Sequence, residues 1–406
     1  MATIADNRGG MCIDKGLNVL SGKFKLHSWL LAGLIALTTL LTSCDLPQVS
    51  AEDRVFLPLS VEFLDAYPIP TKEFAGTTVG GLSAITYDRA RNRLYALSDD
   101  RSEFAPARFY TLNLTLDATD PHAAKIKQTA IEAVTTITNA DGQPYPAGAI
   151  DPEGIALSPL GTVFISSEGI ASQGIPPTIQ EFNLKTGQWQ RNLTIPQRYV
   201  PILEAEQQVQ GVGDNLGFES LTLSPGGTAI EPFRLFTATE SALVQDADAA
   251  HPQQGASRNR VLHYIVEADR SLLISEHLYP MAAVPEGAKF HGLTELLAID
   301  QGGHFLSLER SFGTKGFQIN LFQVAMGSAT DTSRMASFQG SSSIDPVQKK
   351  LLLDLNQLNI RLDNLEGMTL GPRLPDGSQS LLLLSDNNFN TLQITQLLLF
   401  RLQGLK

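Results

Sequence analysis

Acidic side chains recur at matching places along this 406-residue chain. Several short apolar segments open with a glutamate, and the apolar segment that follows each of them ends in a carboxylate. The opening glutamates are Glu153, Glu219 and Glu366, and the terminal carboxylates are Asp99, Glu168, Glu240, Glu309 and Asp386. Carboxylates held close together repel one another and raise one another's pKa unless a positive charge joins them. We therefore expect these eight side chains to bind a metal ion. Ca²⁺ is the candidate, because it accepts about six to eight oxygen ligands in flexible geometry.

Each carboxylate taken singly has a simpler explanation, since acidic residues often accept hydrogen bonds from backbone amides in turns. The five-fold recurrence favours the cation site, because turn chemistry does not require a carboxylate at the same place each time. If the site is catalytic, Glu219 and Glu366 are the candidates for the base that deprotonates a water molecule. Asp100, Asn387 and Asn388 could add further oxygens.

Basic residues close to these carboxylates could bind an anionic substrate. They are Arg101, Lys289, His291 and Arg310. Arginine suits phosphate because its planar fork donates two parallel hydrogen bonds. Each of the four could instead be a salt-bridge partner of a neighbouring carboxylate. The sequence contains no GxSxG, HExxH, Walker-type or EF-hand motif, so carboxylate and metal chemistry is favoured over a serine triad.

The elements that position these residues form an internal repeat of about 70 residues. Five segments share one pattern, and their equivalent positions are spaced 66 to 75 residues apart at Ser83, Glu153, Glu219, Thr294 and Glu366. Each segment reads as a short strand, and three further strand-like segments with intervening Gly, Pro, Asn and Asp follow it. The fifth repeat is one strand short, and residues 55–67 could supply the missing strand.

Four strands per repeat, with the last repeat completed from the opposite terminus, predict an all-β fold, a β-propeller of about five blades. Closing the ring hides the sheet edges that would otherwise invite aggregation. A sixth blade could be concealed in the connections 138–151 or 199–216. The alternative architecture is a β-sandwich followed by a second β domain.

The ordered motifs of these repeats resemble those of a known family. They read GLSAITYDRARNRLYALSDDR, DPEGIAL, GFESLTLS, LERSF and NLEGMTLG. They are similar to the bacterial phytase-like family described as having esterase-like activity, and the resemblance spans about residues 75–400. It implies a relation in fold to β-propeller phytases, which are calcium-dependent and cleave phosphate monoesters. It also implies that the eight carboxylates contact metal or substrate.

The N-terminus reads as a targeting segment. Residues 29–41 carry no charge, follow Lys23 and Lys25, and are too few to span a membrane alone. The run ends in LTSC at Cys44, which resembles a bacterial lipobox, whose cysteine is lipidated. We expect a lipoprotein signal peptide over 1–43, a tether over 44–54 and the propeller over 55–406. A plain signal peptide, a short anchor helix and a start at Met11 remain alternatives.

The charge balance restricts the possible partners. The chain has 30 basic and 42 acidic residues and a net charge of −12. Losing residues 1–43 would remove four basic and two acidic residues, which leaves −14, and would leave one cysteine, which cannot form an internal disulfide. Nucleic-acid binding needs a basic surface, so it is excluded as a partner class.

The sequence thus predicts a protein exported to the bacterial cell envelope, a monomer that contacts the membrane only through its lipid. It is expected to be a metal-dependent hydrolase of phosphoric esters that acts on a small phosphorylated, anionic substrate. The alternative is a non-catalytic propeller that binds a ligand or scaffolds an envelope complex, because the fold hosts both roles.

Overall fold

The computed structural model describes residues 51–247, 257–341 and 343–405. The chain divides into two units, Met1–Ala51 and Glu52–Lys406, of which the second is described below. Apart from Ala51, the first unit lies outside the described residues, and with it the predicted signal peptide and Cys44. Among the described residues, no helix is long and apolar enough to cross a bilayer, and the α-helix there is α2 (Ala51–Val55).

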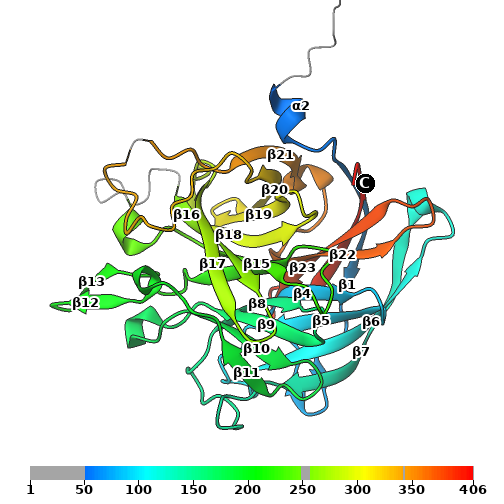
Figure 1. Cartoon of the computed structure of the whole chain (residues 1–406). Coiled ribbons are helices and arrows are strands. Elements are labelled where there is room, and N and C mark those ends of the chain that lie inside the picture. The colour runs from blue at the N-terminus through cyan, green and yellow to red at the C-terminus, as the bar shows by residue number, and fades with distance from the viewer. Residues whose placement is uncertain (1–50, 248–256, 342, 406) are drawn as a thin grey trace, which may run out of the picture. The chain divides into compact units, whose positions relative to one another are not determined.

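The second unit is a propeller of five four-stranded antiparallel sheets (Figure 1). Blade 1 contains β4 (Leu82–Asp88), β5 (Arg93–Ser98), β6 (Arg108–Asp117) and β7 (Lys125–Thr136). Blade 2 contains β8 (Pro152–Leu157), β9 (Thr162–Ser167), β10 (Thr178–Asn183) and β11 (Trp189–Asn192). Blade 3 contains β14 (Phe218–Leu223), β15 (Phe233–Thr239), β16 (Arg258–Val266) and β17 (Ser271–Pro280).

The last two blades complete the ring. Blade 4 contains β18 (Ala288–Ala298), β19 (His304–Gly313), β20 (Gly316–Ala325) and β21 (Gln348–Asp354). Blade 5 contains β22 (Asn364–Arg373), β23 (Gln379–Asp386), β24 (Gln396–Gln403) and, from the N-terminal side, β1 (Ser60–Pro68). Strand β1 pairs antiparallel with β24, so the predicted closure by the N-terminal strand is confirmed.

The two long connections contain no sixth blade in the part of the chain that the structure describes. Residues 138–151 form only isolated bridges, from Thr138 to Pro144 and from Thr138 to Gln188. Residues 199–216 contain a two-stranded hairpin, β12 (Ile202–Glu204) with β13 (Gln207–Gln210), and a second small hairpin joins β2 (Glu73–Phe74) to β3 (Thr77–Thr78). Five blades and one ring also exclude the β-sandwich alternative.

The inner strands β4, β8, β14, β18 and β22 surround the central channel, and each contacts the next around the ring. Their inner edges have no paired strand, so their backbone groups need other partners. Threonine hydroxyls supply some of them: Leu157 N donates to Thr86 Oγ1 at 3.3 Å, and Ala298 N donates to Thr222 Oγ1 at 3.1 Å. Side chains thus join neighbouring blades at the channel.

Apolar residues pack between successive blades, so the middle strands of a blade are covered on both faces. Strand β23 is buried along its whole length, and β24 along all but its last residue. This explains their leucine-rich runs, which do not alternate with polar residues as a half-exposed strand would. The core therefore forms a ring around the channel and fixes the inner strands.

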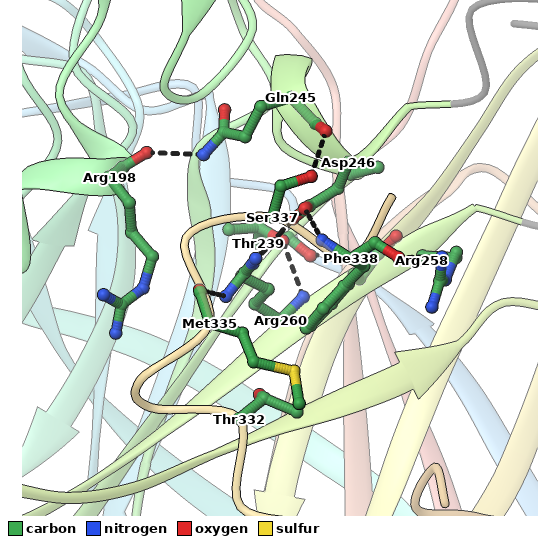
Figure 2. A network of polar contacts seen from close by, with 12 residues as sticks. Arg198, Thr239, Gln245, Asp246, Arg258, Arg260, Thr332, Met335, Ser337 and Phe338 are labelled. Atoms are coloured by element: carbon green, nitrogen blue, oxygen red, sulfur yellow. Dashed lines mark hydrogen bonds and ion pairs between the residues drawn. The ribbon is translucent and has the colours of Figure 1, made fainter. Parts of the chain in front are cut away.

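A buried ionic network ties a long loop of blade 4 to blade 3 (Figure 2). Arg260 Nε donates to Asp246 Oδ2 at 2.6 Å, and Arg260 also pairs with Glu276. The guanidinium lies 3.8 Å from the ring centre of Phe338, which belongs to the loop between β20 and β21. The neighbouring Asn259 donates to the backbone oxygen of Glu240 at 2.6 Å, so the network also supports a residue at the rim of the channel.

Candidate active site

Three glutamates lie at equivalent irregularities of the inner strands. The pairing register between the first and second strands shifts at Glu153 in blade 2, Glu219 in blade 3 and Glu366 in blade 5. A β-bulge of this kind adds an unpaired residue and redirects its side chain. All three glutamates line a cavity of about 900 Å³ at one mouth of the channel. The same shift occurs at Ser83 and Thr294, which confirms the repeat alignment predicted from the sequence.

Four second strands bring a carboxylate to this mouth. Asp99 N donates to Gly81 O at 2.7 Å, Glu168 N to Asp151 O at 3.0 Å, and Glu240 N to Gly217 O at 2.9 Å. In blade 5, Asp386 pairs with Asn364. In each case the carboxylate faces the residue two positions before the bulge. The predicted convergence of Asp99, Glu168, Glu240 and Asp386 with the three glutamates is therefore seen in the fold.

Blade 4 places an arginine at the fifth equivalent position. Gly292, two residues before the shift at Thr294, pairs with Arg310, whereas Glu309 pairs with Leu293. Because side chains alternate between the two faces of a strand, Glu309 points away from the channel mouth. It accepts a hydrogen bond from Tyr279 Oη at 2.7 Å and pairs with Lys349. The expectation that Glu309 joins the carboxylate ring is corrected by this one-residue difference in register.

Arg310 places a positive charge within the ring of carboxylates. Its Nη2 donates to Glu240 Oε1 at 3.0 Å, and its Nη1 contacts both Glu366 Oε1 and Asn364 Oδ1. Burial opposes its charge, but Glu366, Glu240 and Glu219 outweigh that effect and raise the pKa of Arg310. It therefore stays charged and neutralises one side of the ring.

The other three predicted substrate-binding residues lie in different surroundings. Arg101 lines the cavity and donates two hydrogen bonds to Asp151, at 2.7 and 2.5 Å. His291 hydrogen-bonds Ser311 Oγ through Nδ1 at 2.7 Å and Ala282 O through Nε2 at 3.1 Å, beside Glu309. Lys289 is exposed and is not among the described residues that line the cavity. The fold thus brings Arg101 and Arg310 to the cavity, and holds His291 in contacts outside it.

Two overlapping groups of carboxylates lie close enough to share a cation. One oxygen each from Asp151, Glu153 and Glu168 lie within 4.8 Å of one another, and so do oxygens from Glu168, Glu219 and Glu240. Glu168 belongs to both groups. All the donors are carboxylate oxygens, which suit hard cations such as Ca²⁺ or Mg²⁺ better than soft transition metals.

Burial and mutual repulsion raise the pKa of several of these carboxylates. Burial, followed by the charges of Glu168, Glu240 and Glu366, raises the pKa of Glu219 well above its ordinary value. Burial, followed by the charge of Glu219, likewise raises the pKa of Glu153 well above its ordinary value. Burial raises the pKa of Glu366 to about 8 although Arg310 opposes the shift. A cation bound by Glu153 or Glu219 would lower the pKa of that ligand, because it favours the ionised form.

Glu168 carries a feature that a bound cation would explain. Glu168 is 1% exposed, and its Oε1 accepts a hydrogen bond from Gly217 N at 2.6 Å. The other oxygen, Oε2, is buried and has no hydrogen-bond partner among the described residues, and the same holds for Asp386 Oδ1. An unpartnered buried acceptor is costly, so such atoms call for an explanation. A cation bound by Glu168 together with either group would satisfy Oε2, so the residues present fit a metal.

Comparison with known proteins places the chain in a family. The family model described as phytase-like, esterase-like activity of phytase, matches residues 77–389. The chain belongs to the phytase-like family. The resemblance inferred from the sequence motifs is thereby confirmed. No match is found among the curated proteins.

This phytase-like chain is also similar to several solved structures. One is regucalcin from Agrobacterium tumefaciens, described as a calcium-binding protein, with 11% identity, a TM-score of 0.35, and 84% of this chain and 96% of that chain covered. Another is the PQQ-bound aldose sugar dehydrogenase from Streptomyces coelicolor, with 11% identity, a TM-score of 0.36, and 86% and 100% covered. A third is the Pan2 WD40 domain of Neurospora crassa, with 8% identity, a TM-score of 0.31, and 84% and 96% covered.

Two polar residues of the phytase-like site were not predicted from the sequence. Asp151 shares the first carboxylate group, and Asn364 donates from Nδ2 to Glu366 Oε1 at 2.8 Å. Both occupy the position two residues before a bulge glutamate, where the other blades have glycine, and alignment of that position could have found them. Conversely, Asp100 is committed to Arg108 and Asn387 Oδ1 accepts from Gly81 N, so neither of these predicted donors is free for the ring.

Proposed function

We propose that this phytase-like propeller hydrolyses phosphate esters with the help of a divalent cation, for which Ca²⁺ is the candidate. The observation that supports it most is the buried, unpartnered Glu168 Oε2 at the junction of two carboxylate groups. Membership of the phytase-like family supports a phosphate ester as the substrate class. Such a cation, when bound, would neutralise phosphate oxygens and acidify a water molecule.

The residues of the ring have separable roles in this proposal. Glu153 and Glu168 would hold the cation, with Asp151 and Glu240, each also paired with an arginine, beside them. Glu219 is the base, because it lines the cavity and is not among the carboxylates that pair with Arg310. It takes the proton of the attacking water while the new bond from oxygen to phosphorus forms and the bond to the alcohol breaks. The alcohol then leaves with a proton.

Glu366 and Arg310 act as a pair on the other side of the cavity. The contacts with Arg310 and Asn364 fix the orientation of Glu366. Glu366 belongs to neither group of carboxylates that could share the cation, and burial raises its pKa to about 8, so it can carry the proton that the leaving alcohol takes. Arg310 lines the cavity, and its charge, shared with Glu240 and Glu366, offsets part of the negative charge around the phosphoryl group.

The test is turnover of simple phosphate monoesters by the purified protein with Ca²⁺, and with a chelator. We expect turnover only with the cation, and a loss of about 10²-fold or more in Glu219→Gln, which removes the base. Glu286→Gln is the matched control, because the side chain of Glu286 is 95% exposed. Absence of turnover in every condition, with Ca²⁺ still raising the melting temperature, would favour a non-catalytic binding propeller instead.

We also propose that the protein is exported and held at the cell envelope by lipid on Cys44, and that it functions as a monomer. The uncharged run 29–41 and the small residues before Cys44 support this. Replacing Cys44 with serine should release the protein from the membrane fraction into the soluble fraction. Retention of the variant in the membrane fraction would contradict the lipid anchor.

A further inference from the structure

The exposed aromatic side chains of this protein are concentrated at the mouth of the acidic cavity. Among the described residues, the exposed large aromatics are Phe104, Phe290 and Phe312, at 62%, 66% and 39%, and all three line the cavity. Leu392, 81% exposed, lies there too. Single exposed apolar residues are ordinary on protein surfaces, but apolar residues gathered around one cavity indicate a binding surface.

A second layer of aromatic residues supports the first. Phe389 stacks on Phe104 with ring centres 4.5 Å apart, and Phe317 packs on Phe312 with ring centres 4.7 Å apart. Both supporting rings line the cavity as well. We call these five phenylalanines with Leu392 the apolar collar. It comes from blades 4 and 5 and from the loop after β5 in blade 1.

The backbone that carries Phe389 is held in an unfavourable conformation. Phe389 has φ 51° and the preceding Asn388 has φ 45°, a left-handed region that a bulky side chain rarely adopts. Asn387 Oδ1 accepts from Phe389 N at 3.1 Å, and the Phe389 ring lies against Gly81, where an added Cβ would collide with it. Strained conformations persist where the surrounding structure imposes them, and they cluster at ligand sites.

The arginines that line the cavity are already paired with carboxylates. Arg101 is bound to Asp151, and Arg310 to Glu240 and Glu366. Arg361 pairs with Asp363 and donates to Leu392 O at 2.6 Å. A ligand with many phosphates would need several free cations, which these arginines do not provide. The side chains present therefore match a ligand with one phosphoryl group, bound among the carboxylates, and one apolar group, bound on the collar.

We infer that the substrate is a phosphate ester of an apolar alcohol, with its phosphoryl group at the carboxylate ring and its apolar group on the collar. This rests on the proposed phosphoesterase function and names its substrate class. Burying a ring-sized apolar group against such a surface is worth about 10- to 100-fold in kcat/KM.

The experiment compares benzyl phosphate with ethyl phosphate, whose alcohols have similar acidity, and with inositol hexakisphosphate, a polyanion. In the presence of Ca²⁺ we expect kcat/KM to be at least about tenfold higher for benzyl than for ethyl phosphate. The hexakisphosphate should be the poorest of the three. Phe104→Ser and Phe290→Ser should each lower the benzyl-to-ethyl ratio. Ile230→Ser, a change at a residue that is 94% exposed and does not line the cavity, should leave the ratio unchanged.

Binding of benzylphosphonate and ethylphosphonate, which lack the cleavable bond, separates this inference from the proposed function. Turnover of both esters at equal rates, or a ratio that the two serine variants do not change, would overturn the collar and leave the phosphoesterase in place. No turnover, with benzylphosphonate still bound more tightly than ethylphosphonate, would overturn the catalytic function and keep the ligand class. Equal or absent binding of the two phosphonates without turnover would overturn both.

Discussion

Two hydroxyl residues occupy the bulge position in the blades that lack a glutamate there, and each braces the next blade. Ser83 Oγ donates to Glu153 O at 3.1 Å, and Thr294 Oγ1 donates to Leu365 O, beside Glu366, at 3.3 Å. These residues therefore hold the backbone of a neighbouring glutamate instead of adding another charge. In blade 4, Arg310 stands where the second strands of the other blades bring a carboxylate. Ser83, Thr294 and Arg310 together limit the repulsion between carboxylates that five identical blades would create.

The first prediction concerns Glu168→Gln, which keeps the shape of the side chain and removes its charge. We expect Ca²⁺ affinity to fall by more than about tenfold, since mutating even a residue that only hydrogen-bonds a metal ligand lowers affinity by about that much. Without the cation the variant should unfold at a higher temperature than the parent at neutral pH, because a buried charge and its repulsion with Glu240 are lost. Thermal melts with and without Ca²⁺ measure both effects.

Glu286→Gln again serves as the control for the Glu168 experiment, and its melts should match the parent in both conditions. A Glu168→Gln variant with an unchanged Ca²⁺-induced rise in melting temperature would show that Glu168 is not a ligand. A variant that is less stable in both conditions would instead indicate that the charged carboxylate has a structural role with Gly217 N.

Strand ends and bulges determine which side chains meet, and small residues allow the close approach. The backbone of Glu168 packs on Gly217 of the next blade, and the side chain of Glu240 packs on Gly292, so an added Cβ at either glycine would collide with the glutamate. The glycines therefore allow a carboxylate of one blade to lie over the inner strand of the next. This contact between blades closes the acidic ring.

The second prediction is that Gly217→Ala destabilises the protein by about 1–3 kcal/mol, as overpacking does elsewhere. The added Cβ would meet the backbone of Glu168, which cannot rotate away as a flexible side chain could. Displacing Glu168 should also weaken Ca²⁺ binding. Denaturant unfolding and cation titration measure the two losses. Gly327→Ala is the control, because a Cβ there has no neighbour within 4 Å.

The strands and the five-fold repeat could be predicted from the sequence because the apolar runs and the 66- to 75-residue spacing leave a clear pattern. The register within a strand pair could not, because a bulge changes the face of every residue beyond it. Glu309 and Arg310 are an example. A shift of one residue in register places Arg310 at the channel and Glu309 between blades. The collar was also missed, because Phe104, Phe290 and Phe389 lie in different repeats and show no common spacing.

At the scale of the whole molecule, stability depends on closing the ring between the two ends of the domain. Strand β1 covers the edge of β24, and Phe63 packs edge-on against Phe400 with ring centres 5.5 Å apart. Each blade is held between two neighbours, so loss of one strand exposes an edge and part of the core. No pair of cysteines is available in the described residues to replace this contact.

The third prediction follows for chains shortened from the N-terminus. Removal of residues 1–70 deletes β1, so the protein should lose its single cooperative melt and associate through the exposed β24 edge. Removal of residues 1–50 leaves every described strand and should leave the melting temperature unchanged. Calorimetry and light scattering on the two shortened chains measure this. A cooperative melt at the parent temperature without β1 would contradict ring closure as a requirement.

The fourth prediction links pH to the unbalanced charge of the ring. Burial raises the pKa of Glu366 to about 8 and that of Asp386 to about 6, above their ordinary values of 4.5 and 3.8. The folded state therefore binds more protons than the unfolded state between those limits. Without a divalent cation, the free energy of unfolding should be highest at low pH within this window and should fall as pH rises from about 5 to 8.

A bound cation should reverse or remove this fall in the free energy of unfolding with rising pH. It requires ionised ligands and therefore binds more tightly as pH rises. Urea unfolding at pH 5, 6.5 and 8, with Ca²⁺ or with a chelator, separates the two cases. Glu366→Gln should reduce the decline seen with chelator, since it removes one titrating group. Stability that increases with pH in the chelated protein would mean that the ring is balanced by its own arginines, and the acidic excess of the chain would then have no link to a metal.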